Sequence, residues 1–255
     1  DAYGETTVNY NRDIEIFPVV NAMFELIYGE SPYKSPTDMG VNMAGNCICD
    51  DEACSDASRQ EIIRRYYKCL CDKKRFGESK DNAYKLELLM KQAGITLADR
   101  KVAKAALDRE ERSNGQPTAA IELADGQIVT GENGELLGAS AAALLNAIKV
   151  LAGIDHEVKL VSSDAIAPIQ RLKTEYLGSK NPRLHTDEIL IALSSTAASD
   201  STAALALEQL NKLRGCEAHS SVLLSSVDEQ IFKKLGMHLT SEPKYEETDR
   251  KYHKN

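Results

Sequence analysis

The strongest constraint on the fold is a change in sequence pattern at Ser113–Pro117, where charged helical segments give way to short apolar runs. Beyond this point Asp125-Gly126 separates two apolar runs, an arrangement typical of a tight β-hairpin. Short strands and amphipathic helices then alternate, which predicts a mixed-sheet α/β domain over residues 114–243, followed by a polar tail at 244–255. The predicted strands are Ala119–Leu123, Gln127–Thr130, Val158–Val161, Ile189–Leu193, Ser221–Leu224 and Met237–Thr240. The predicted helices are Ala139–Leu151, Asp164–Tyr176, Thr202–Leu213 and Asp228–Leu235.

Residues 50–113 have a different pattern and form a helical section with charged outer faces. Apolar side chains recur at helical spacing in three stretches, and breaks or capping residues separate these stretches. The predicted helices cover about Asp50–Lys74, Asn82–Ala93 and Leu97–Arg112, and Thr96 is the expected N-cap of the third helix.

Residues 1–49 are rich in loop-forming residues and contain one apolar segment. Its side chains recur at helical spacing between Ile14 and Ile27, and Gly29 supplies a C-terminal stop. The next segment, Ser31–Gly45, contains two prolines and two glycines, which predict an ordered loop without regular helix. The chain opens without an initiator Met, so we treat it as a fragment. We expect residues 1–49 to pack with an N-terminal half of the same protein.

The charge of the chain argues against some partners. It has 39 acidic against 31 basic residues and a formal net charge of −8, and an acidic chain repels nucleic acid and anionic lipid unless its basic residues cluster. The one dense basic run, Lys73-Lys74-Arg75, ends a predicted helix, where cations favour the helix dipole. No apolar run reaches the roughly 18–20 residues that cross a bilayer. We expect a cytoplasmic protein that binds neither nucleic acid nor membrane, and the sequence leaves a homo-oligomer open.

Six cysteines are present, five of them between residues 47 and 71. Cys47/Cys49 and Cys69/Cys71 are spaced C-x-C, whereas zinc knuckles and thiol redox sites commonly use C-x-x-C. In a helix this spacing separates the two sulfurs by about 200° around the helix axis. We therefore expect free thiols in a reducing compartment, and no bound zinc.

Several strings resemble a bacterial family described as domain of unknown function 1846. They are Tyr10–Asp13, Ser31–Asn42, Gln60–Tyr67, Ile169–Lys173, Asn181–His185 and Gly215–Ser220, and the resemblance covers essentially the whole chain. It implies that members are about twice as long and that this chain is the C-terminal half. It also implies that the other half carries a Gly-rich segment similar to a phosphate-binding loop, which would bind ATP and Mg²⁺. No such loop occurs in this sequence.

The Ser31–Gly45 segment is the first candidate site. Its polar side chains would suit phosphate or Mg²⁺ chemistry contributed to a composite site. They are Lys34, Ser35, Thr37, Asp38 and Asn42, with Asp38 as the candidate catalytic carboxylate. The alternative is a structural loop in which Asp38 and Asn42 bond their own backbone.

The second candidate precedes the predicted strand Ile189–Leu193. Lys180, Asn181 and Arg183 could grip an anion, and His185 could act as acid or base. The alternative is a turn in which a backbone carbonyl satisfies the histidine.

The third candidate is His219, which follows Cys216 by three residues. Two ligands are too few for a zinc site, and a strand would place these two side chains on opposite faces. A hydrogen-bonded structural histidine is one interpretation, and a ligand contact is the other.

The predicted hairpin and the small-residue helix Ala139–Leu151 resemble the entry to the cytidine deaminase fold. That enzyme class needs Cys- or His-Ala-Glu at this helix start and Pro-Cys-x-x-Cys at the next one. Ala139–Leu151 has no Cys, His or Glu, and the expected second helix start, Ser194–Thr202, has no Cys or His. The sequence therefore favours a deaminase-like topology without its zinc chemistry.

These patterns predict the C-terminal part of a nucleotide- or phosphate-metabolite-using enzyme that supplies substrate-side residues. The competing interpretation is a non-catalytic nucleotide-binding or regulatory protein. If the polar loops serve one pocket for a small phosphate-bearing ligand, residues 34–42 should lie near Arg183 and His185, or near His219.

Overall fold

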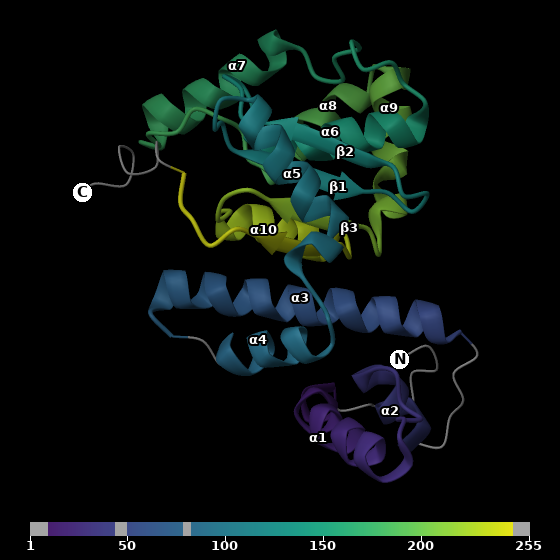
Figure 1. Cartoon of the computed structure of the whole chain (residues 1–255). Helices are drawn as coiled ribbons and strands as arrows, with labels where there is room; N and C mark the ends of the chain where they lie inside the picture. The colour runs from purple at the N-terminus through teal and green to yellow at the C-terminus, as the bar shows by residue number, and fades with distance from the viewer. Residues whose placement is uncertain (1–9, 44–49, 79–82, 247–255) are drawn as a thin grey trace. The chain divides into compact units, whose positions relative to one another are not determined.

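The computed structural model describes residues 10–43, 50–78 and 83–246, and the chain divides into two compact units (Figure 1). The first unit takes residues 1–70 and 78–100, and the second takes residues 71–77 and 101–255. Within the described ranges, every helix is too short or too polar to cross a membrane.

The first unit is helical. Its elements are α1 (Tyr10–Tyr28), α2 (Pro36–Met43), the part of α3 (Asp51–Phe76) up to residue 70, α4 (Ala83–Gln92) and a 3₁₀ turn, η1 (Leu97–Asp99). Helix α1 contacts both α2 and α4, and it ends at Gly29, whose φ of +83° suits glycine.

Helix α2 corrects the prediction of a loop at Ser31–Gly45. Pro36 occupies the first helical position, where its missing N–H has no helical partner to lose. Residues 44 and 45 lie outside the described residues.

The second unit is built on a four-stranded mixed sheet, which confirms the predicted α/β class. Its strands are β1 (Thr118–Glu122), β2 (Ile128–Glu132), β3 (Glu217–Ser220) and β4 (His238–Ser241), in the order β2-β1-β3-β4. Strand β1 is antiparallel to β2 and β3, and β3 is parallel to β4. Strands β2, β3 and β4 therefore run in the same direction, so their carboxyl ends lie at one edge of the sheet.

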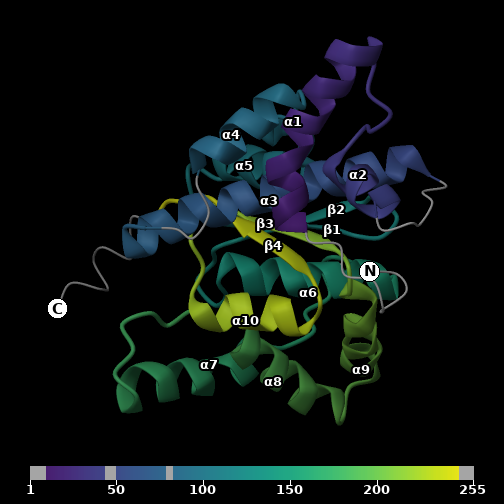
Figure 2. The same cartoon turned by 90° about the horizontal axis from the view of Figure 1, so that it is seen from below.

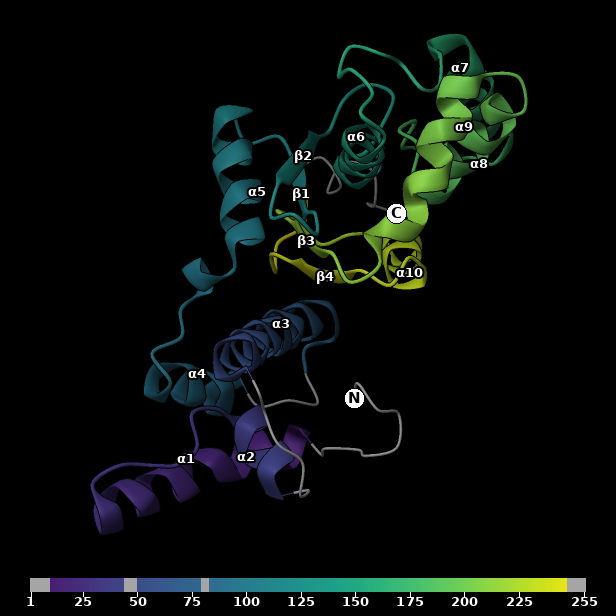
Figure 3. The same cartoon turned by 90° about the vertical axis from the view of Figure 1, so that its right-hand side faces the viewer.

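Helices cover both faces of this sheet (Figures 2 and 3). Helix α5 (Lys101–Arg112) covers one face, where Ala120 packs against Val102 and Ala106. The other face packs on α6 (Ala139–Ala152) and α10 (Ser226–Lys234). Outside these two lie α7 (Ser163–Arg171), a π-helical turn η2 (Leu172–Tyr176), α8 (Thr186–Ala197), α9 (Ser201–Leu207) and a 3₁₀ segment η3 (Glu208–Leu213).

Helix α6 lies unusually close to β2. A Cβ added to Gly131 would collide with the backbone nitrogen of Ala143 and would lie 2.7 Å from the carbonyl carbon of Ala142. Only glycine lets the two backbones approach this closely. This contact fixes where α6 begins, next to the carboxyl end of β2.

Three predicted strands are wrong. Ile189–Leu193 lies in α8, which buries Ile189, Ala192 and Leu193 at helical spacing. Val158–Val161 forms no strand, and the strand predicted at Ser221–Leu224 lies earlier, at β3. A short apolar run cannot by itself distinguish a buried strand from a buried helix, and β3 consists of small and polar residues.

Candidate functional site

The candidate site lies at the carboxyl edge of the sheet, where loops follow β2, β3 and β4. The segment before α8 lies beside the loop that follows β2. Leu184 forms a parallel bridge with Leu137, and the Leu184 N–H donates to Leu136 O at 2.9 Å. Helices α6, α8 and α10 all begin at this edge, and their N-termini favour negative charge.

His185 and Asp228 form a dyad at this edge. His185 Nδ1 lies 2.9 Å from Asp228 Oδ2, and Asp228 Oδ1 accepts bonds from both the backbone N–H and the hydroxyl of Thr186 at 2.9 Å. Ser225, the N-cap of α10, donates to Asp228 Oδ2 at 2.8 Å. The Asp228 side chain is 6% exposed and that of His185 30%, so a buried carboxylate orients a ring that solvent reaches.

The two groups shift each other's pKa in opposite directions. The hydrogen bond that His185 Nδ1 donates to Asp228 raises the pKa of His185 against the opposing effect of burial. Burial alone would raise the pKa of Asp228, but the hydrogen bond and charge of His185 outweigh it and hold that pKa at about 2. The geometry therefore stabilises the imidazolium form of His185 against the Asp228 carboxylate, and Nε2 of His185 is left as the nitrogen that can exchange a proton.

A second ion pair lies beside the dyad. Arg183 Nη1 bonds Glu246 Oε1 at 2.9 Å, and Arg183 Nε donates to Gly134 O at 2.9 Å. Asn133 Nδ2 donates to the same Glu246 oxygen at 3.1 Å, while Asn133 Oδ1 accepts from the N–H of Ala139 at the start of α6. A carboxylate is thus held by the Arg183 guanidinium and an amide at the carboxyl end of β2.

A buried lysine supports the segment that carries both groups. Lys173 Nζ donates to Arg183 O at 2.6 Å and to Glu188 Oε2 at 2.8 Å. Glu188 also accepts from the backbone N–H of His185 at 2.8 Å. These bonds fix the backbone on both sides of Leu184, so the positions of Arg183 and His185 are coupled.

The other predicted residues of the second unit lie outside this site. Lys180 is exposed, and Asn181 Oδ1 accepts from the Arg183 backbone N–H at 3.1 Å, which shapes the turn. His219 is fully buried on β3, where Nδ1 bonds Thr240 Oγ1 at 2.8 Å and Nε2 lies 3.4 Å from Glu242. Cys216 packs in the core on the opposite face of the sheet from His219.

The first predicted site belongs to the other unit. Asp38 Oδ2 accepts from the Lys34 N–H at 2.8 Å, and Ser35 Oγ accepts from the Asp38 N–H at 3.0 Å. Thr37 Oγ1 lies 2.8 Å from Ser58 Oγ. These bonds hold the start of α2, and the side chain of Asn42 lies outside the described residues. The convergence of this segment with Arg183, His185 or His219 stays a prediction.

Apolar side chains of α1 line a groove in the first unit. The groove has a volume of about 660 Å³ and lies between α1 and α4. Leu26 is 87% exposed and Val19 61% exposed. An apolar surface of this kind can pack against further protein.

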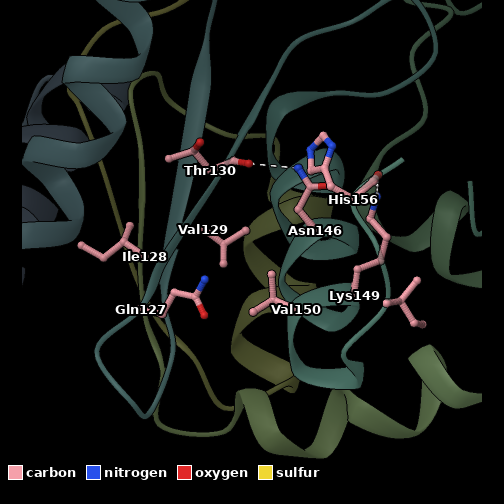
Figure 4. A pocket seen from close by; sticks show the side chains of 9 residues that line it. Gln127, Ile128, Val129, Thr130, Asn146, Lys149, Val150 and His156 are labelled. Atoms are coloured by element: carbon pink, nitrogen blue, oxygen red, sulfur yellow. Dashed lines mark hydrogen bonds between the residues drawn. The ribbon is translucent and has the colours of Figure 1, made fainter. Parts of the chain in front are cut away.

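Figure 4 shows a pocket of about 260 Å³ beside the edge strand β2. Lys149, which is 8% exposed, donates to the backbone oxygens of His156 at 2.6 Å and Val158 at 3.3 Å, and burial lowers its pKa. Asn146 Nδ2 donates to Thr130 O at 3.0 Å. These two side chains hold α6 to the adjoining loop and to β2, so the pocket is a weaker candidate than the dyad.

The described parts of the chain offer few groupings of side chains that could bind a metal ion. No group of three or more His, Cys, Asp or Glu side chains there is placed to hold a metal ion. Cys71 and Cys216 are free thiols, whereas Cys47 and Cys49 lie outside the described residues. Burial raises the pKa of Cys71 to about 12, which disfavours the thiolate that metals bind.

Sequence reasoning identified Arg183 and His185 but missed their partners. Asp228 was assigned only to a helix start, and Lys173 and Glu246 carried no assignment. The one local signal was Ser225-x-x-Asp228, which has the spacing of a capping box.

Comparison with known proteins identifies the family. Residues 98–251 match the family model described as domain of unknown function DUF1846, C-terminal, and residues 1–94 match the corresponding N-terminal model. The chain is 56% identical over 245 residues to a UPF0371 protein of Corynebacterium glutamicum (strain R), covering 96% of the chain and 49% of that protein. It is 56% identical over 252 residues to a UPF0371 protein of Streptococcus pneumoniae (strain JJA), covering 99% of the chain and 51% of that protein.

The chain therefore belongs to the DUF1846 family, as its sequence strings predicted, and it spans about half the length of the curated relatives it matches. Because residues 1–94 match the N-terminal model, the prediction that the chain is simply the C-terminal half is not supported. The expected packing of residues 1–49 with a separate N-terminal half is not supported for the same reason.

Proposed function

We propose that this DUF1846 chain is part of an enzyme acting on a nucleotide or another phosphate-bearing metabolite, with His185 as its acid–base group. The observation that carries the proposal is the dyad: a buried Asp228 holds Nδ1 of a partly exposed imidazole at 2.9 Å. A carboxylate in this position orients the ring and stabilises the imidazolium, which prepares Nε2 for proton transfer.

The surrounding charges favour an anionic substrate. Three helix N-termini and the Arg183 guanidinium lie at the same edge of the sheet as the dyad. Because the pKa of His185 is raised, the ring can donate a proton from Nε2 to a leaving oxygen near neutral pH.

The sheet supports one further part of the proposal, a deaminase-like framework. A β1–β2 hairpin, helix α6 and the parallel pair β3 and β4 agree with that comparison. The helix that follows β3 is α10, not the Ser194–Thr202 stretch expected from sequence, and its start, Ser225–Asp228, also lacks Cys and His. The dyad would then lie where a deaminase places its zinc ligands, so a different chemistry is proposed.

ATP and Mg²⁺ remain part of the proposal only for the longer relatives. This sequence has no glycine-rich phosphate-binding loop, and it spans about half of their length. ATP and Mg²⁺ would bind to the part of the relatives that this chain does not span, and this is inferred from the resemblance alone.

A non-catalytic nucleotide-binding or regulatory protein is the second candidate. The observation that favours it is the ion pair between Arg183 and Glu246, which already neutralises the main cation of the site. A regulatory protein would bind a ligand there without converting it.

Turnover distinguishes the two candidates. The chain is incubated with a mixture of nucleotides and sugar phosphates, and the consumption of each compound is followed by mass spectrometry. For an enzyme, replacing His185 with Gln should lower turnover at least about 100-fold, as expected for loss of a general acid–base group. His156→Gln is the matched control, because that side chain is 80% exposed and far more solvated. Binding without consumption, or full turnover in His185→Gln, would refute the enzymatic proposal.

A further inference from the structure

The Glu246 carboxylate is held as an anionic ligand would be. Its Oε1 accepts from Arg183 Nη1 and from Asn133 Nδ2, and the Glu246 side chain is only 13% exposed. We propose that Arg183 and Asn133 form a binding seat for the phosphate of the substrate, and that Glu246 occupies this seat until a phosphate displaces it. This inference rests on the proposed function for the identity of the ligand and adds the place where its phosphate binds.

Backbone direction places the seat next to the dyad. Leu184 pairs as a β-bridge and its side chain is fully buried, so the chain is extended there. In an extended chain, residues two apart point to the same side and lie about 6.6 Å apart. Arg183 and His185 therefore face the same side, and a phosphate on Arg183 would bring its ester oxygen towards the His185 ring.

Glu246 uses only part of what Arg183 offers. Nε of Arg183 bonds Gly134 O, and Nη1 bonds Glu246, while Nη2 makes no hydrogen bond within the described residues. A phosphate presents several oxygens and could accept from Nη1 and Nη2 together, an arrangement that strengthens binding. It also carries about −1.5 to −2 charges at pH 7, against −1 for a glutamate.

The segment that carries Glu246 can move away from Arg183 without disturbing the core. After β4 it is held by the Leu223 N–H, which donates to Lys244 O at 2.8 Å, and by Lys244 Nζ, which bonds Glu110 at 2.7 Å. The Lys244 side chain is 50% exposed, so this second bond is weak. Displacement of Glu246 would break its contacts with Arg183 and Asn133 among others, and the incoming phosphate would replace these two.

Removing Glu246 should therefore tighten phosphate binding. The dissociation constant of inorganic phosphate is measured by titration calorimetry at constant ionic strength. Glu246→Ala should lower it at least about tenfold, because a tethered carboxylate competes at an effective concentration in the millimolar range. Arg183→Ala should abolish the binding. The exposed pair Arg171–Glu175 supplies matched controls, since Arg171→Ala and Glu175→Ala should change nothing.

The outcomes separate this inference from the proposed function. An unchanged dissociation constant in Glu246→Ala, or phosphate binding that survives Arg183→Ala, would overturn the seat. If Arg183→Ala fails to fold, Arg183→Lys replaces it and should weaken binding at least about tenfold, because lysine lacks the two-pronged fork. His185→Gln should keep phosphate binding while it loses turnover. Retained turnover in that variant would overturn the proposed function and leave the seat intact.

Discussion

Replacing Asp228 with Asn removes the charge that holds His185 while keeping nearly the same side-chain shape. Asp228 is 6% exposed, and its pKa is about 2 against an ordinary value of 3.8. At 1.36 kcal/mol per pH unit, this difference corresponds to roughly 2 kcal/mol of stabilisation of the second unit. The neutral amide also leaves the imidazolium without its counter-charge, so we expect Asp228→Asn to lose about 2–4 kcal/mol of unfolding free energy.

The pH dependence has a defined sign. The stabilisation from Asp228 is present above pH 3.8 and is lost as the pH falls towards 2, because protonation breaks the pair. The stabilisation from His185, whose pKa is raised, is complete below its ordinary pKa of 6.5 and is lost as the pH rises through its folded pKa. The pair should therefore stabilise the fold most between about pH 4 and 6.5.

Urea unfolding at pH 5.5 and pH 8.5, with an NMR titration of the His185 ring, tests this reasoning. Asp228→Asn should lose more stability at pH 5.5 than at pH 8.5, and the pKa of His185 should fall below 6.5, because burial and nearby Lys173 then prevail. Asp164→Asn, an exposed acid in the first turn of α7, controls for helix-dipole effects. A His185 pKa that stays above 6.5 in Asp228→Asn would show that Asp228 does not cause the shift.

Three further expectations follow from packing and burial. Gly131→Ala should destabilise the second unit by ~3 kcal/mol or more, because the added Cβ would collide with the backbone of Ala143. Thermal melting measures this loss. Gly134→Ala is the control, because a Cβ added there meets nothing within 4 Å. Lys173→Ala should remove the cation that bonds Arg183 O and Glu188 Oε2, cost about 2–4 kcal/mol, and speed tryptic cleavage of the 177–185 loop. Cys71→Ser should leave the number of thiols that react with a disulfide reagent at pH 8 unchanged in the folded protein, since burial raises the pKa of Cys71 to about 12.

Local patterns predicted the parts of the fold that depend on neighbouring residues. The hairpin was predicted from Asp125-Gly126, whose turn requires a residue with positive φ, and Gly126 has a φ of +84°. Helices α6 and α10 were predicted from apolar spacing. In each case the residues that determine the element lie within a few positions of it.

Elements whose state depends on distant partners were mispredicted. The apolar run at Ile189–Leu193 fits a strand or a helix equally well, and the surrounding core decides for α8. Strand β3 has the sequence Glu-Ala-His-Ser, which has no strand pattern of its own. It forms because Ala218 and His219 lie between β1 and β4, where every backbone group finds a partner.

The same distinction explains how much of the site was predictable. Arg183 and His185 were identified because their residue types suit anion binding and proton transfer. Their partners, Asp228 and Glu246, come from segments more than 40 residues away in sequence, and they reach the site only because β2, β3 and β4 end at the same edge. That edge could not be located once β3 and α8 had been assigned wrongly.

Asp228 shows why a local motif can conceal a functional residue. It is the third residue after the N-cap Ser225, a position where an acid commonly reaches back to the N-cap backbone. Here Oδ1 takes two bonds from Thr186 at the start of α8, and Oδ2 takes His185 and the Ser225 hydroxyl. Ser225 Oγ caps α10 by accepting from the Asp228 N–H, which an Asn at this position would keep. An Asp228→Asn variant should accordingly retain α10 while losing the orientation and charge of His185.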